Sequence, residues 1–465
     1  MTAEPALGDH REGSARRPNR AVTLTGWGRI MPTTAEIADP ASAADAAALL
    51  RTARRVIPRG LGRSYNNAAQ SAGGLVLSTA RLNRIIALDP ATGLADCEAG
   101  TSLERLMTAG LPHGWFVPVS PGTRQVTIGG AIAADVHGKN HHRAGSFATH
   151  VRDLTLLLPF GELRTVTPGG DPELFWATAG GMGLTGLIMR ARVQLTKVGT
   201  SLLRVNTVRT ADIDETMRVL AEHDATHSYT VAWSDSMATG SATGRSVITS
   251  GDFASVRDLP ASARDTPFHF DPRPKLALPN VFPAGLLNRR SIRLANEIWY
   301  RKAPKSRHGE IQTISQFFHP LDGIRNWNRV YGPGGFRQYQ YVLPFGEEEA
   351  VRRSFEMVSA LPAPSFVTVL KRFGDADPGL LSFPRPGWTL ALDFPARTPA
   401  LLPLLDRLDR LVLEHGGRVY LAKDSHVARP AFEAMYPQVE TFREIRTRID
   451  PDRVFASDLS RRLGL

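Results

Sequence analysis

The sequence predicts an α+β fold in two parts, and three observations support this expectation. Apolar segments of strand length alternate with a few helical segments along the chain, as in folds built on antiparallel sheets. Glycine-rich segments interrupt these elements within the first two hundred residues. Near residue 200 the pattern changes to longer units of strand and helix, so a second part of the fold is expected to begin there.

In the first part, the residue types indicate short strands joined by turns and capped helices. An Ala-rich segment, 41–54, has the propensity of a helix, and residues 101–104 have the Thr-x-x-Glu form of a capping box that opens a helix to residue 109. Phe160 and Gly161 are typical of a hairpin turn between strands at 154–159 and 162–167. The other expected elements are strands at 74–78, 85–89, 95–99 and 187–195 and a helix at 171–179.

In the second part, strands and helices are expected to alternate. The expected strands are 202–209, 228–234, 338–343, 366–373, 388–394 and 418–422, and the expected helices are 213–223, 347–360 and 401–415. Gly416 and Gly417 suit the end of the last of these helices, and the tail is expected to be helical to Leu465.

Between 264 and 309 the chain is rich in Pro and Arg and is expected to be a loop. Seven basic residues stand against two acidic ones between 285 and 310, with apolar residues between them. This pattern fits a solvated surface loop. It equally fits a loop that lies on anionic lipid headgroups or admits a lipid-phosphate substrate, and the sequence leaves both interpretations open.

Composition excludes several classes of protein. The chain has 465 residues, 42% of them hydrophobic, a formal net charge of +11 and one cysteine, Cys97, which excludes a disulfide framework and a Cys-built zinc or iron–sulfur site. No apolar run approaches the ~18 residues of a membrane-spanning helix. Residues 1–20 lack the apolar core of a secretory signal, so we expect a disordered N-terminus and a cytoplasmic protein, free or peripheral at the inner membrane face. No helix-turn-helix, zinc or RNA-binding signature points to a nucleic-acid partner.

Three glycine-rich segments are candidates for binding phosphate, because backbone N–H groups without side chains between them can surround an anion. They are 58–65, 121–130 and 180–186, and the first two suggest a dinucleotide held from both sides. The third matches G-x-G-x-x-G. However, a helix is expected before it and a strand after it, and no acidic residue lies between Gly186 and Asp212, so a Rossmann nicotinamide site is not expected.

These segments, together with residues 24–28, 137–142, 422–425 and 455–458, resemble the vanillyl-alcohol-oxidase-type flavoenzymes with a PCMH-type FAD-binding domain. Within them, they resemble the decaprenylphosphoryl-β-D-ribose 2-oxidase family, from about Leu24 to the C-terminus. The resemblance implies an α+β FAD-binding domain at 21–199 and a substrate-binding domain with an antiparallel sheet at 200–415. It also implies a C-terminal segment, 416–465, that returns to the FAD domain.

The resemblance further implies which residues contact FAD. The implied contacts are Pro58, Arg59, Gly60, Leu61, Gly62, Arg63, Ser64, Tyr65, Asn66, Asn67, Ala68, Gly122, Thr127, Ile128, Gly129, Gly130, Ala134, Asp135, Val136, His137, Ile188 and Tyr420. Many relatives attach flavin covalently through a His in the first loop. Arg63 stands at the matching position and no His lies nearby, so FAD is expected to be non-covalent.

The implied reaction moves a hydride from a secondary alcohol to flavin, and the alcohol proton needs a base. Lys423 matches the family's essential lysine and could stabilise the alkoxide or the reduced flavin, or act as the base; His137 is the second catalytic candidate. A metal held by His137, His141 and His142 is not expected, because no carboxylate follows in that segment. The implied substrate contacts are Lys139, Trp233, Phe318, Gln338, Gln340, Lys371, Phe373 and Thr389, with Lys371 the expected partner of a substrate phosphate.

The chain departs from the family pattern on the sugar side. The family usually has Tyr at Phe318 and Asn and Cys at Thr389 and Ala391. These departures motivate a second hypothesis about the substrate. The first hypothesis, which the resemblance implies, is oxidation of the 2′-hydroxyl of a polyprenyl-phosphoryl ribose, which a separate NAD(P)H-dependent reductase would complete to the arabinose epimer for cell-wall arabinan. The alternatives are a flavin oxidase of a soluble sugar, alditol or nucleoside, and a non-enzymatic basic protein that binds membrane or nucleic acid.

Overall fold

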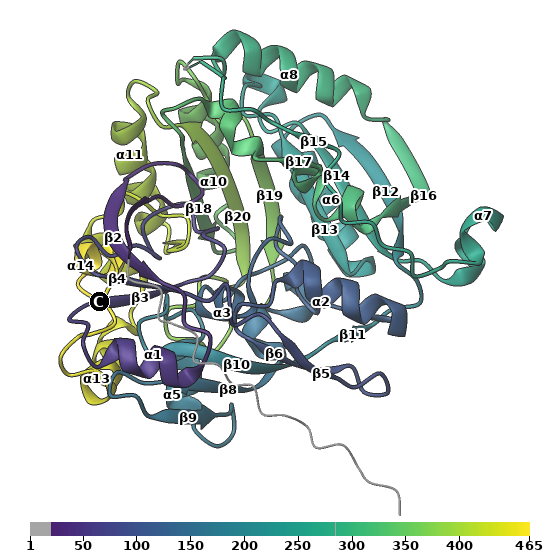
Figure 1. The fold of residues 1–465 in the computed structure, drawn as a ribbon. Helices are drawn as coiled ribbons and strands as arrows, with labels where there is room; N and C mark the ends of the chain where they lie inside the picture. Colours follow the sequence, from purple (N-terminus) through teal and green to yellow (C-terminus); the bar gives the residue numbers. More distant parts are fainter. Residues whose placement is uncertain (1–19, 284) are drawn as a thin grey trace, which may run out of the picture.

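The structure is a computed structural model that describes residues 20–283 and 285–465 (Figure 1). The disordered N-terminus expected at 1–20 falls almost wholly outside the described residues, and Arg20 is the first residue of strand β1. In the part of the chain that is described, no helix is long and apolar enough to cross a membrane.

Two sheets form the first part of the molecule (Figure 1). One has four strands in the order β1(Arg20–Leu24), β2(Thr33–Ala38), β4(Leu75–Ser78), β3(Val56–Arg59), with β2 and β3 parallel to β4. The other is antiparallel, in the order β5(Ile85–Leu88), β6(Leu94–Glu98), β10(Leu187–Gln194), β8(Val151–Leu157), β9(Leu163–Val166). A third, two-stranded pair joins β7(Trp115–Phe116) to β11(Thr196–Lys197).

The helices of this part are α1(Ala43–Leu50), α2(Leu103–Gly110), α3(Ile128–Ala133), α4(His141–Ala144) and α5(Pro172–Thr178), and α4 contacts strand β19(Thr368–Phe373) of the second part. The apolar side chains of α2, α3 and α5 form a common buried cluster with β6, β8 and β10. This cluster fixes the start of α3, which belongs to the second glycine segment.

An antiparallel sheet of eight strands forms the second part. Its order is β16(Ser306–Thr313), β12(Leu202–Thr210), β14(Ser246–Phe253), β13(Tyr229–Ser234), β19(Thr368–Phe373), β20(Gly387–Pro395), β18(Phe336–Leu343), β21(Arg418–Val419). The helices of this part and of the tail are α6(Ile213–Thr226), α7(Ala261–Arg264), α8(Arg289–Lys302), α9(Ile314–Phe317), α10(Glu348–Ser359), α11(Leu401–Glu414), α12(Arg429–Met435), α13(Val439–Ile449) and α14(Asp458–Leu463). A short parallel pair, β15(Leu276–Ala277) and β17(Ile324–Arg325), lies outside the sheet.

Alternation along the strands gives the large sheet two different faces. On β20, Leu390 and Leu392 point into the core with α6, α10 and α11, whereas Ala391 and Asp393 line a cavity on the other face. The same alternation turns side chains of β13, β18 and β19 toward the cavity. These are Val231, Trp233, Gln338, Gln340, Val369 and Lys371. One sheet therefore supplies both the core and one wall of the candidate site.

The C-terminal segment contacts the first sheet again. Val56 and Phe455 form a β-bridge, and the Val56 amide donates to the carbonyl of Val454 at 2.7 Å. Asp458 accepts hydrogen bonds from the Thr33 hydroxyl at 2.7 Å and the Ala72 amide at 2.8 Å. These bonds hold both ends of the described chain against the same strands.

Several expected elements are confirmed, including the hairpin β8–β9, the helix α10 and the helix α11. The order around the third glycine segment is also as expected, because α5 precedes it and β10 follows it. The expected capping box at 101–104 is wrong by one residue, since Ser102 caps α2 by accepting from the Arg105 amide. Strand β14 was not expected, and the tail forms three separate helices.

The expectation of a loop throughout 264–309 is wrong, because it contains helix α8 and the start of strand β16. Asn288 caps α8 by accepting from the amides of Arg290 and Ser291, and Ile292 and Asn296 are buried one turn apart. Pro and Arg are frequent in the segment, but no Pro lies between the cap and Lys302, so the helix is free to form. The strand expected at 418–422 is also shorter than predicted and ends at Val419.

Candidate functional site

A cavity of about 930 Å³ lies between the glycine segments of the first part and the open face of the eight-stranded sheet. Most of the residues expected to contact FAD line it. These are Pro58, Gly60, Leu61, Gly62, Arg63, Ser64, Tyr65, Ala68, Gly122, Thr127, Gly129, Gly130, Ala134, Val136, His137, Ile188 and Tyr420. The cavity also receives Lys139, Trp233, Phe318, Gln338, Gln340, Lys371 and Lys423.

The loop after β3 is shaped to hold an anion. The backbone N–H groups of residues 60–64 donate to no other group in the described structure, although all five residues line the cavity. Gly62 has φ of +64°, and a Cβ at Gly60 would overlap the Thr127 hydroxyl. Unpaired amides beside a cavity are costly unless a ligand or solvent accepts from them. The loop therefore fits the pyrophosphate of a dinucleotide such as FAD.

Some expected FAD residues lie behind the cavity wall and support it. Arg59 donates to the carbonyls of Thr25 at 2.7 Å and Ala69 at 3.1 Å, and Asn66 donates to the carbonyl of Leu421 at 2.7 Å and to that of Asp424. The other residues of this kind are Asn67, Ile128 and Asp135. Asn66 thus ties the flavin loop to the turn that carries Lys423.

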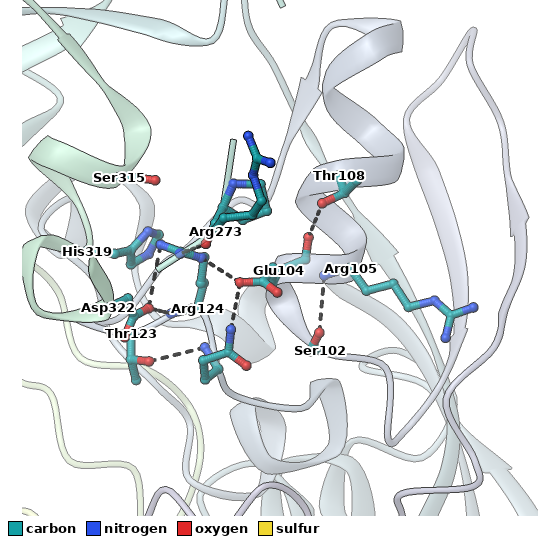
Figure 2. A network of polar contacts seen from close by, with 12 residues as sticks. Ser102, Glu104, Arg105, Thr108, Thr123, Arg124, Arg273, Ser315, His319 and Asp322 are labelled. Atoms are coloured by element: carbon teal, nitrogen blue, oxygen red, sulfur yellow. Dashed lines mark hydrogen bonds and ion pairs between the residues drawn. The ribbon is translucent and has the colours of Figure 1, made fainter. Parts of the chain in front are cut away.

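A buried ion network anchors the second glycine segment (Figure 2). Arg124 is 1% exposed; its Nε pairs with Glu104 at 2.7 Å, and its amide donates to Asp322 at 2.9 Å. Gln125 also donates to Glu104, at 2.6 Å. Asp322 belongs to the second part of the chain, so this network joins the flavin-side loop to the segment after α9.

Three lysine side chains lie inside the molecule and open onto the cavity. Burial lowers the pKa of Lys139 to about 7, and burial together with the charges of Lys423 and Lys139 lowers that of Lys371 to about 7. Burial also lowers the pKa of Lys423, to about 8, while the nearby carboxylate of Asp393 opposes the shift. Lys139 donates to the carbonyl of Phe317, and Lys423 lies 5.6 Å from the Tyr65 ring. The cavity therefore holds more positive charge than its own walls compensate.

Asp393 is a site residue that the sequence analysis missed. It is 1% exposed, lines the cavity and accepts a hydrogen bond from the Gln338 side chain. Burial raises the pKa of its carboxyl to about 7, although the Gln338 hydrogen bond and the Lys423 charge act in the opposite direction. Its alternation with Leu392 and Phe394 on the expected strand 388–394 is a signal that could have revealed it.

Lys423 reaches the cavity because β21 ends early. After Val419 the chain turns, and the amides of Lys423 and Asp424 both donate to the carbonyl of Tyr420, at 3.0 and 2.9 Å. The turn projects Lys423 toward the cavity. A strand continuing to residue 422 would lack these two hydrogen bonds.

His137 belongs to a chain of hydrogen bonds with a fixed direction. The Thr389 hydroxyl donates to the carbonyl of Tyr341 at 2.9 Å, so it accepts from the Gln340 amide group at 2.8 Å. That NH2 group also lies 3.1 Å from His137 Nε2, which must accept. Burial, reinforced by the Lys371 and Lys423 charges, lowers the pKa of His137 well below its usual value, so the ring is neutral and its proton lies on Nδ1. Nδ1 has no partner in the described protein.

The remaining expected substrate residues differ in their exposure to the cavity. Trp233 and Phe318 line it, whereas Phe373 and Thr389 lie one layer behind. Phe373 packs on the His137 ring, with 4.8 Å between ring centres. Trp299 of α8 lines the cavity beside Trp233, with 6.1 Å between the ring centres. The sequence analysis did not assign Trp299 to the site because no helix was expected there.

His141 and His142, the two histidines that follow His137, pair with different carboxylates. His141 pairs with Asp377 at 3.1 Å and His142 with Asp224 at 3.6 Å. Within the described ranges, no group of three or more His, Cys, Asp or Glu residues is arranged to hold a metal ion.

Comparison with known proteins identifies the family of this chain. A family model described as an FAD binding domain matches residues 34–167, and one described as D-arabinono-1,4-lactone oxidase matches residues 395–463. The chain is 44% identical over 458 residues to a decaprenylphosphoryl-β-D-ribose oxidase of Mycolicibacterium smegmatis, which covers 96% of this chain and 98% of the relative.

Two further relatives show how the similarity is distributed. An uncharacterized protein in the mprA 5′ region of Streptomyces coelicolor is 42% identical over 78% of this chain and its own full length. Cytokinin dehydrogenase 2 of Arabidopsis thaliana is 30% identical over 34% of this chain and 32% of its own. The similarity to the Mycolicibacterium smegmatis protein extends over almost the whole length of both chains, and residues 34–167 match the FAD binding domain. This protein is therefore an FAD-dependent oxidoreductase that belongs to the decaprenylphosphoryl-β-D-ribose oxidase family.

Proposed function

We propose that this protein oxidises the 2′-hydroxyl of a polyprenyl-phosphoryl-β-D-ribose to the 2-keto sugar. The observation that carries the proposal is the group of three inward-facing lysines, Lys139, Lys371 and Lys423, around one cavity beside an anion-binding loop. A sugar joined to a lipid through phosphate would supply a negatively charged partner for these lysines. The substrate named for the 44% identical relative supports the same assignment.

Lys139 and Lys371 are proposed to bind the substrate phosphate. Lys371 lies on the sheet face with its Nζ 3.5 Å from the carbonyl of Gly138, and Lys139 packs over the Phe317 ring at 4.4 Å. An anion between them would raise both pKa values again and keep both amines charged at pH 7. Charge pairing inside the cavity therefore favours a phosphorylated sugar over a neutral one.

FAD, when bound, supplies the group that accepts the hydride. Lys423 is proposed to hold the substrate hydroxyl oxygen and to stabilise the negative charge that develops there, with Asp393 as its counter-charge. The Asp393 carboxyl, with a pKa of about 7, is the wall group suited to take up the alcohol proton near neutral pH. The proposed role of His137 is to orient the flavin or the sugar as a neutral ring in the cavity wall.

Non-covalent binding of FAD is part of the proposal. Arg63 is engaged by the Trp27 ring, 3.9 Å from its guanidinium, and by the carbonyl of Gln125 at 3.1 Å. Among the residues that the structure describes, His137 is the histidine that lines the cavity, and its Nε2 accepts from Gln340. Burial raises the pKa of the Cys97 thiol to about 12, and Cys97 does not line the cavity. Acid precipitation should therefore release the yellow flavin into the supernatant.

The test is the visible absorbance of the purified holoprotein under anaerobic conditions. A short-chain prenylphosphoryl ribose should bleach the flavin band, and free ribose and alditols should not. Bleaching by an alditol or a nucleoside, with no response to the phosphoryl sugar, would contradict the proposal.

A second candidate function, oxidation of a soluble sugar, alditol or nucleoside, is favoured by the sugar side of the cavity. Phe318 is buried among Phe116, Tyr229 and Phe253 and has no hydroxyl, and Ala391 lines the cavity with a methyl group.

The product of the proposed reaction on the lipid-linked sugar is a ketone, and we propose that a separate NAD(P)H-dependent reductase completes the epimerisation for cell-wall arabinan. The cytoplasmic location stays a prediction.

A further inference from the structure

Helix α8 lies at the outer edge of the molecule and has two unlike faces (Figure 1). Its inner face is tied to the protein. The Asn296 side chain donates to Asp235 at 2.7 Å, Arg289 donates to the carbonyl of Ser359 at 2.7 Å, and the Tyr300 hydroxyl donates to that of Thr210 at 3.1 Å. These bonds leave the opposite face turned to the outside.

The outer face of α8 carries apolar side chains where a solvated helix would carry polar ones. Leu294 and Ile298, one turn apart, are 63% and 57% exposed, and Leu286 before the helix is 40% exposed. Of the 14 large hydrophobic residues exposed in the described structure, six lie between 276 and 299. This concentration is the kind that marks an interaction surface.

Basic residues surround this apolar face. Arg290 and Arg293 are exposed and form no ion pair in the structure as described, whereas Arg301 pairs with Glu297. We define the outer face of α8 as Leu286, Arg290, Arg293, Leu294, Ile298 and Arg301. Apolar side chains flanked by unpaired arginines suit the boundary between lipid headgroups and acyl chains, and the charge favours an anionic bilayer.

The same helix forms part of the cavity wall. Trp299 and Lys302 of α8, and Ala303 and Pro304 after it, line the cavity, while Leu294 and Ile298 do not. A surface held on a bilayer by this helix would therefore lie next to the part of the cavity wall that Trp299 and Lys302 form.

We propose that the outer face of α8 docks on an anionic phospholipid bilayer and thereby brings the cavity to its lipid-linked substrate. This inference rests on the proposed function and deepens it. The sequence suggested that a loop within 264–309 could lie on lipid headgroups, and the structure shows that the segment contains a helix, α8.

The test compares sedimentation of the holoprotein with vesicles of phosphatidylcholine alone and of an equimolar mixture with phosphatidylglycerol. The wild type should bind the mixed vesicles more tightly, and binding should weaken as salt is added. The double variant Leu294→Glu/Ile298→Glu should bind at least about tenfold more weakly, because it replaces two apolar contacts by repelled charges. The matched control is Phe160→Glu/Leu163→Glu, at the exposed hairpin β8–β9 on the far side of the molecule, and should bind like the wild type (Figure 1).

The outcomes separate docking from the reaction. Flavin reduction by a soluble short-chain prenylphosphoryl ribose, without vesicles, should be the same in the wild type and in Leu294→Glu/Ile298→Glu. If that substrate fails to reduce the wild type, the proposed function fails while sedimentation still reports on docking. The docking proposal is overturned if the wild type does not bind mixed vesicles or if the two double variants bind alike. It is also overturned if Leu294→Glu/Ile298→Glu only converts a dimer into a monomer.

Discussion

Replacing Thr389 by Val should impair the reaction although Thr389 does not line the cavity. The Thr389 hydroxyl gives its proton to the Tyr341 carbonyl and thereby fixes the orientation of the Gln340 amide, which in turn keeps the proton of His137 on Nδ1. In Thr389→Val the Gln340 amide is free to rotate and present its carbonyl to His137 Nε2. The ring proton would then move to Nε2, and Nδ1 would change from a donor to an acceptor.

The magnitude follows from the hydrogen bonds that are lost. Thr389 is fully buried, and Val has a similar shape, so the cost comes from the hydroxyl. A buried N–H of Gln340 loses its acceptor, which should lower the free energy of unfolding by about 1–3 kcal/mol. Loss of one donor worth about 0.5–1.5 kcal/mol should slow flavin reduction roughly 2- to 10-fold.

The assay is stopped-flow reduction of the bound flavin, with ¹⁵N NMR of the histidine side chains to identify the His137 tautomer. Thr389→Ser keeps the hydroxyl and should restore both the rate and the Nδ1 proton. A merely structural role would lower stability without changing the tautomer. The reasoning is refuted if Thr389→Val reduces flavin at the wild-type rate with the proton still on Nδ1.

Three further outcomes are expected. The rate of flavin reduction should fall as pH rises through about 8, because the Lys423 amine is charged below its pKa and neutral above it; since Asp393 is already ionised above pH 8, a rate that climbs from pH 8 to 9 would instead make Lys423 the base. Gly60→Ala should weaken FAD binding at least about tenfold, measured by flavin content and titration, because its Cβ would displace Thr127 at the anion-binding loop, and Gly169→Ala, where nothing lies within 4 Å, should bind FAD normally. Arg124→Met should lower the unfolding free energy by about 3–5 kcal/mol in chemical denaturation, because it leaves two carboxylates without their buried partner; a loss below 1 kcal/mol would show that the pairing is not needed.

The strand and helix pattern of the large sheet could be predicted from the sequence because its signals are local. Strands β18 and β20 and helix α10 follow periodic apolar residues, and their bounds lie within two residues of the expected ones. Helix α8 could not be found this way. Its apolar residues point outward, so the pattern of a buried face, on which the prediction rests, is present only at Ile292 and Asn296.

The candidate site could be predicted only in part, for a related reason. The glycine segments and Lys423 were found through a family resemblance, whereas Arg124 has no local signature that distinguishes it from a surface charge and Asp393 has only its place on an apolar strand. Both are buried because segments that are distant in the sequence meet around them, 55 residues away for Gln338 and Asp393 and 198 for Arg124 and Asp322. Asp393 needs Gln338 and Lys423 beside it, and Arg124 needs Asp322.

The inward-facing lysines link the stability of the fold to the function proposed for it. A lysine within an expected strand is normally assigned to the solvent face, and burial of its charge costs free energy unless a partner compensates it. Between pH 7 and 10.5 an unfolded chain holds protons on Lys139 and Lys371 that the folded protein without an anion releases, so these residues reduce stability more as pH falls toward 7. An anionic ligand removes this cost by pairing with the charged amines. Ligand binding should therefore stabilise the protein more at pH 7 than at pH 10, which links the same lysines to folding and to the choice of a phosphorylated substrate.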